Sequence, residues 1–163
     1  MIRNLGASEV LKLEIHSRSM LFAGFSFTDC QDANPHLNNL KGSSGKNITG
    51  WIINATYYQQ QSHYPECMNN HNWHGFHGDD AIGSIKTTLH GCGSAKLDFG
   101  NCYRKGITQV KLNGELIGDA SSNTPNKVIL FDFNDGAILE LQEVNTGIIV
   151  FNDLSITKCN SCS

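Results

Sequence analysis

The stretch from 82 to 99 limits the fold more than any other part of the chain, because apolar and polar residues alternate with period two on both sides of a glycine-rich turn. Successive side chains of a β-strand point to opposite faces, so each run has one apolar and one polar face. The residues on the apolar faces are Ile85, Thr87, Leu89, Ala95, Leu97 and Phe99. Two such runs around a turn predict a β-hairpin with one buried face and one face in contact with water.

The segments that follow repeat this pattern up to the last residues of the chain. The dipeptide Asn113-Gly114 between two alternating runs is a strong hairpin signal, and Asn134-Asp-Gly136 indicates a further hairpin. The strands expected around these turns are 107–112, 115–118, 127–133, 137–141 and a closing strand over 147–156. The second half of the chain is therefore predicted to be entirely β.

The first half is less regular. The β-branched and aromatic content of 51–58 and the phenylalanines of 20–27 predict two strands. Residues 1–20 are an N-terminal strand or extension, in which strand and short helix are both open for 8–16, with the strand favoured. Turn-forming and polar residues without periodicity predict long loops over 31–50 and 59–80.

These elements predict a fold class. A chain of 163 residues suits a single domain over 1–163, large enough to bury a core. Eight or nine short strands with turn signals every eight to twelve residues, and no convincing helix, are typical of an all-β antiparallel β-sandwich or jelly roll. The prediction is such a sandwich with two long loops.

Composition narrows the setting and the partners. Twelve Lys and Arg against 15 Asp and Glu give a net charge of -3 without a basic patch, which predicts no nucleic-acid partner. No apolar run approaches the roughly 20 residues of a membrane span, so no membrane insertion is expected. Six cysteines and two glycosylation sequons, at Asn47 and Asn54, favour an extracellular, secreted protein.

The C-terminal half, 82–159, contains a succession of motifs: G-S-x-x-T-T-L, L-D-F-G-N-C, V-x-L-N-G, F-x-F-x-D-G-x-x-L-x-L and I-x-F-N-x-L-x-I-x-x-C. This succession resembles the galactose-binding-like β-sandwich modules of secreted animal proteins. The resemblance covers about half the chain and rests mostly on turns and core positions. It implies a jelly roll whose end loops bind glycans or partners, and it carries over no catalytic residue.

The segment from 71 to 80 concentrates ionisable side chains that could bind a metal. His71, His74 and His77 are nitrogen donors that suit zinc, copper or nickel, although this spacing is not an established zinc motif. Asp79 and Asp80 could instead hold a structural calcium, as jelly rolls of this kind often do at a loop base. The favoured interpretation is a solvated loop without a required cofactor.

Carbohydrate binding is the chemistry that the aromatic residues suit best. Sugars stack their C–H faces on aromatic rings, while amide, imidazole and guanidinium groups bond their hydroxyls. The candidate ligand-binding residues are Trp73, His74, His77, Asn101, Tyr103 and Arg104. Trp51, inside a strand, is expected to belong to the core instead.

No nucleophile motif, phosphate-binding loop or metalloprotease pattern is present in the sequence. The first hypothesis is therefore a non-enzymatic module that binds a glycan or a glycosylated protein, in the manner of a lectin or adhesion domain. Two alternatives stay open. One is a structural module that self-assembles, as a homo-oligomer or within a larger extracellular assembly, and the less favoured one is a metal-dependent hydrolase.

The cysteines lead to a prediction of three disulfides. Cys102 and Cys159 both follow strand ends, so a bridge between them is expected to clamp the closing strand. Cys30 and Cys67 flank the long loops and form the expected second pair. Cys92 and Cys162 remain as the third pair, one of 15 connectivities that six cysteines allow.

Overall fold

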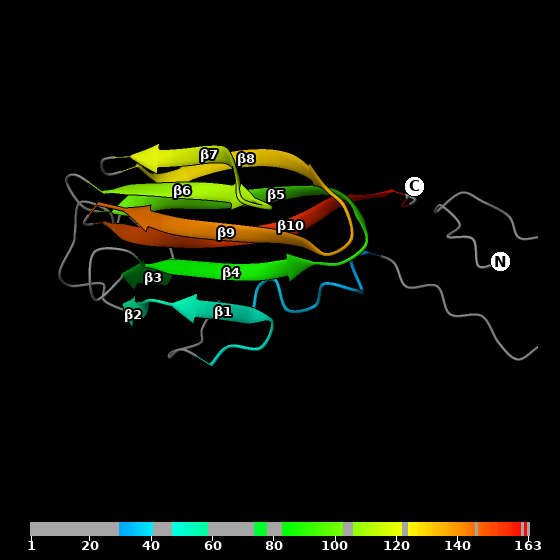
Figure 1. The fold of residues 1–163 in the computed structure, drawn as a ribbon, viewed down its shortest axis with the longest axis horizontal. Coiled ribbons are helices and arrows are strands. Elements are labelled where there is room, and N and C mark those ends of the chain that lie inside the picture. Colours follow the sequence, from blue (N-terminus) through cyan, green and yellow to red (C-terminus); the bar gives the residue numbers. More distant parts are fainter. Residues whose placement is uncertain are drawn as a thin grey trace, which may run out of the picture.

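The computed structural model describes residues 30–40, 47–58, 74–77, 83–102, 106–121, 124–145, 147–160 and 162. Within these residues ten strands form two five-stranded antiparallel sheets that face each other (Figure 1). The strands are β1 (Trp51–Asn54), β2 (Thr56–Tyr58), β3 (His74–His77), β4 (Ser84–Leu89), β5 (Cys92–Cys102), β6 (Ile107–Leu112), β7 (Glu115–Ser121), β8 (Thr124–Phe133), β9 (Ala137–Val144) and β10 (Ile148–Asn160). The predicted all-β antiparallel sandwich is confirmed.

The order of the strands gives the sandwich its topology. Sheet A has the order β1-β4-β9-β6-β7, and sheet B has the order β2-β3-β10-β5-β8. The chain passes from one sheet to the other at every connection except β2 to β3 and β6 to β7. This repeated change of sheet is the jelly-roll arrangement expected of a galactose-binding-like fold. No helix in the described part is long and apolar enough to cross a membrane.

The core lies between the inner faces of the two sheets, where the alternation of 82–99 predicted it. Ile85 and Leu89 of β4 and Leu97 and Phe99 of β5 are fully buried. Trp51 is 6% exposed and packs edge to face on Phe151, with ring centroids 5.4 Å apart. The prediction that Trp51 belongs to the core is therefore confirmed.

The predicted hairpin over 82–99 is wrong, although both of its strands exist. β4 pairs with β1 and β9 in sheet A, whereas β5 pairs with β10 and β8 in sheet B. The predicted hairpin around 134–136 is wrong for the same reason, because β8 lies in sheet B and β9 in sheet A. Both turns connect facing sheets rather than neighbouring strands.

These two connections hold each other in place. The backbone N–H of Gly91 donates to Oδ1 of Asp135 at 2.7 Å, and the N–H of Gly136 donates to the carbonyl of Leu89 at 2.9 Å. The turn residues that indicate hairpins in the sequence thus form hydrogen bonds with backbone groups where the chain crosses between the sheets.

The hairpin at Asn113-Gly114 is confirmed. β6 and β7 pair antiparallel, and the two turn residues have φ angles of 51° and 86°. A two-residue turn with positive φ at both positions is the type that matches the twist of paired strands, and asparagine and glycine adopt it at the lowest cost.

Two further segments differ from the prediction in detail. The strand expected over 51–58 is two strands, because the chain changes sheet at Ala55 between β1 and β2. The loop expected over 59–80 contains β3. Within the loop expected over 31–50, Leu37 and Leu40 are buried in the core. The elements expected over 8–16 and 20–27 lie outside the described residues.

The disulfides correct two of the three predicted pairs. Cys30 is bonded to Cys159, which excludes both the Cys102–Cys159 and the Cys30–Cys67 bridges. The bond between Cys92 and Cys162 is confirmed. Cys102 is also disulfide-bonded, and Cys67 lies outside the described residues.

The antiparallel pairing of β5 with β10 explains the error. Cys102 is opposite Ile148, whereas Cys159 is opposite Gly93. Neighbouring antiparallel strands finish at opposite ends of a sheet, so two cysteines that each follow a strand end are separated by roughly 30 Å along a pair of this length.

Candidate functional site

The end of the sandwich at which β3 and β5 finish and β10 begins, which we call the loop end, is the candidate site. β10 lies between the other two strands: Ile149 is opposite Phe76 of β3 on one side and opposite Asn101 of β5 on the other. Strands in a sheet are about 4.8 Å apart, so the last residues of β3 and β5 are roughly 10 Å apart. The segments that follow His77 and Cys102 therefore start from neighbouring positions.

The strands β3 and β5 lie in or lead into the two stretches of sequence that contain most of the candidate ligand-binding residues. The backbones of His74 and His77 belong to β3, while their side chains lie outside the described part. The other candidates outside the described residues are His71, Trp73, Asp79, Asp80, Tyr103 and Arg104. The structure thus shows that the two stretches begin close together at the ends of β3 and β5, and it describes none of these side chains.

Asn101 is the one candidate ligand-binding residue whose side chain is described, and it has no exposed surface. Its Nδ2 donates to Oγ1 of Thr108 in the facing sheet at 3.2 Å, and its Oδ1 is buried with no hydrogen-bond partner among the described residues. A Cβ added to Gly147 would lie 2.6 Å from Nδ2, which only glycine avoids. Contrary to the expectation from sequence, Asn101 supports the loop end from inside the sandwich and does not face a ligand in solution.

Glu143 is a second buried polar residue at this end, and sequence reasoning missed it. Its carboxylate has no exposed surface and accepts a hydrogen bond from the N–H of Gly147 at 2.5 Å. Glu143 is opposite Thr108 in the pairing of β9 with β6, so it lies near the Asn101 contact. The signal was present in the sequence, because Glu143 continues the buried positions of Ala137, Leu139 and Leu141.

Together these residues form a buried polar base beneath the loop end. Gly106 and Gly147 approach so closely that a Cβ on Gly106 would lie 2.3 Å from the Cα of Gly147. Glu143 fixes the backbone at the start of β10, and Asn101 links sheet B to sheet A. Residues on the connection from β5 to β6 and on the connection from β9 to β10 are thereby held against each other.

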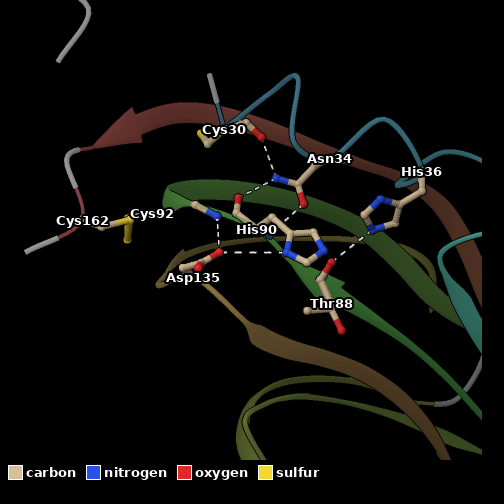
Figure 2. Close-up of polar contacts among 9 residues, drawn as sticks. Cys30, Asn34, His36, Thr88, His90, Cys92, Asp135 and Cys162 are labelled. Atoms are coloured by element: carbon tan, nitrogen blue, oxygen red, sulfur yellow. Dashed lines mark hydrogen bonds and ion pairs between the residues drawn. A yellow bond between two sulfur atoms is a disulfide. The ribbon is translucent and has the colours of Figure 1, made fainter. Parts of the chain in front are cut away.

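The opposite end of the sandwich carries the Cys30–Cys159 disulfide. The Cys92–Cys162 disulfide lies at the same end, beside a network of side chains that bind backbone groups (Figure 2). Asn34, which is 5% exposed, donates from Nδ2 to the carbonyls of Cys30 at 2.6 Å and His90 at 2.7 Å. Its Oδ1 accepts from the N–H of His90 at 2.9 Å. The asparagine side chain thus takes the place of a neighbouring strand at the connection from β4 to β5.

Two histidines lie beside this network. His36 is hydrogen-bonded through Nε2 to the carbonyl of Thr88 at 3.1 Å, and its ring meets that of His90 edge to face, with centroids 6.0 Å apart. Nδ1 of His90 is 3.9 Å from Oδ1 of Asp135, and both side chains are at least half exposed. Among the described residues, no group of three or more His, Cys, Asp or Glu side chains could hold a metal ion.

Comparisons with known proteins find solved structures that are similar to this chain in fold. Neither protein-family models nor curated proteins give a match. Among solved structures, CBM51 from Clostridium perfringens GH95 in complex with methyl-galactose is 16% identical, with a TM-score of 0.43, covering 71% of this chain and 93% of its own. A family 35 carbohydrate-binding module from Clostridium thermocellum is 17% identical, with a TM-score of 0.37 and coverages of 63% and 92%.

A third similar structure is a family 29 carbohydrate-binding module from Piromyces equi, at 13% identity and a TM-score of 0.40, covering 69% of this chain and 84% of its own. At these TM-scores the similarities identify neither a ligand nor a binding residue in this chain.

Proposed function

We propose that this protein is a secreted, non-enzymatic module that binds carbohydrate, free or on a glycoprotein, at the loop end. The observation that carries the proposal is the register of β3, β10 and β5, in which Ile149 lies between Phe76 and Asn101. Because of this register, the segments that follow His77 and Cys102 begin at neighbouring positions. These are the segments for which the sequence suggests sugar binding.

The proposed contacts follow from the chemistry of sugars. Trp73 and Tyr103 provide aromatic faces for stacking, while His74, His77 and Arg104 provide hydrogen bonds to hydroxyl groups. The buried polar base of Asn101 and Glu143 supports the proposal, because a backbone that is held in place before binding loses less conformational entropy when a ligand binds. A structural calcium at Asp79 and Asp80 is part of the proposal.

Secretion is supported by the covalent chemistry of the chain. Two disulfides among the described residues favour an oxidising compartment. The sequon asparagines Asn47 and Asn54 are both exposed, as an N-linked glycan requires. Expression in a secretory host should add two glycans, and the N47Q and N54Q variants should each lose one by intact mass.

A glycan array with the full chain, with calcium or with chelator, tests the proposed function. Binding of at least one sugar class is expected, with a loss of about tenfold or more in affinity for Trp73→Ala and Arg104→Ala, since removal of a central contact typically costs over 1 kcal/mol. His90→Ala, at the opposite end, is the matched control and should bind normally. Absence of binding to every sugar in both buffers would overturn the proposal.

A further inference from the structure

The four edge strands found among the described residues differ in how well they are protected against pairing with another chain. β1 and β2 are short, with four and three residues, and β1 carries the exposed sequon residue Asn54. β7 is interrupted by a register shift opposite Val110 and Lys111, and such irregularities prevent edge-to-edge pairing. β8, at the edge of sheet B, has ten residues; its pairing has a register shift between Thr124 and Lys127 and is uninterrupted from Lys127 to Phe133.

β8 also exposes apolar side chains. Val128 is 51% exposed and Leu130 is 72% exposed, and both lie on the outer face of sheet B, opposite Asp98 and Lys96 of β5. An edge that is regular over 127–133 and exposes aliphatic residues is the kind of edge that natural sheets cover or pair. The far side of β8 has no strand partner among the described residues.

We propose that β8 is a self-association surface and that its partner is β8 of a second copy of this chain. The sequence of the strand is self-complementary when two copies pair antiparallel about Ile129. In that register Val128 is opposite Leu130 of the second copy, and Asn126 is opposite its Asp132. The pairing covers both exposed aliphatic side chains and places an amide donor against each carboxylate.

This pairing forms a closed dimer with two-fold symmetry, since each copy uses the same strand. The two β8 strands run in opposite directions, so the loop ends of the two copies point away from each other. Where the loop end binds carbohydrate, as proposed above, the dimer bridges two separate ligands. That last consequence rests on the proposed function, whereas the dimer does not.

Analytical ultracentrifugation of the full chain without sugar tests the surface. The wild-type protein should show a concentration-dependent monomer–dimer equilibrium. Leu130→Lys should weaken the dimer about tenfold or more, because it replaces an apolar contact with Val128 of the second copy by an ammonium group beside an aliphatic side chain. Ile52→Lys is the matched control, because Ile52 is also 72% exposed but lies on sheet A. It should leave the equilibrium unchanged.

A charge pair tests the register itself. Val128→Glu combined with Leu130→Lys in one chain places opposite charges across both symmetry-related contacts, so the double variant should dimerise more strongly than Leu130→Lys alone. A wild-type chain that stays monomeric at every concentration would overturn the proposal, as would equal weakening by Ile52→Lys. Failure of the charge pair to restore dimerisation would overturn the pairing about Ile129. Each result is read without sugar, so it is independent of the glycan array.

Discussion

The side-chain amide of Asn34 binds both backbone groups of His90: Oδ1 accepts from its N–H at 2.9 Å and Nδ2 donates to its carbonyl at 2.7 Å. Asn38 does the same for Leu154 of β10, at 3.4 Å and 3.1 Å. The turn-rich segment after Cys30 is thus attached to the connection from β4 to β5 and to sheet B through amide side chains that imitate a strand. Asparagines that in the sequence indicated only loop are structural residues here.

Replacement of Asn34 should destabilise the protein. Asn34→Ala leaves backbone groups near Cys30 and His90 without partners and should cost about 1–3 kcal/mol in the free energy of unfolding. Asn34→Asp should cost at least as much, because it sets a carboxylate against two carbonyl oxygens. Denaturant unfolding measures both. Asp32→Ala, at an exposed position in the same segment, is the control and should change stability by less than about 0.5 kcal/mol.

The disulfide connectivity gives a second prediction. Peptide mapping without reduction should recover Cys30 linked to Cys159 and Cys92 linked to Cys162. In the chain-entropy model the first bond stabilises by about 5 kcal/mol and the second by about 4 kcal/mol, so replacing Cys30 and Cys159 together should lower the melting temperature substantially. A peptide joining Cys102 to Cys159 would contradict the antiparallel register of β5 and β10.

The buried carboxylate at the loop end gives a third prediction. Glu143→Ala leaves the N–H of Gly147 buried without this acceptor and should lower the free energy of unfolding by about 1–3 kcal/mol. Glu143→Gln keeps an acceptor oxygen and should recover part of this loss. Thermal and denaturant unfolding of both variants provide the measurement. Equal stability of Glu143→Ala and the wild type would show that Glu143 does not hold the start of β10.

The sequence predicts faces better than it predicts pairing. The alternation around Ile85 and Leu97 identifies buried positions correctly, because successive side chains of a strand point to opposite faces whatever strand it pairs with. The same alternation does not reveal whether a turn leads to a neighbouring strand or to the facing sheet. The turns at His90-Gly91 and at 134–136 therefore look like hairpin turns in the sequence, whereas in the structure they connect the two sheets. At Asn113-Gly114 the turn type is specific enough to decide the question.

The candidate site shows the same limit. The sequence identifies residue types that suit sugar binding near His77 and after Cys102. The proximity of the ends of β3 and β5, next to which these residues lie in the sequence, depends on β10, which pairs with both strands and is far away in the chain. The buried role of Asn101 depends on Thr108 in the facing sheet, a contact between sheets that no local pattern contains.

The most direct test of carbohydrate binding at the loop end is a nuclear magnetic resonance titration of isotope-labelled protein with the sugar that gives the strongest array signal. The largest amide shifts are predicted at the ends of the three strands that meet there, at His77, Cys102 and Ile148. His90 and Asp135 at the disulfide end should not shift. Largest shifts at the disulfide end, or no saturable shift at any residue, would contradict the account.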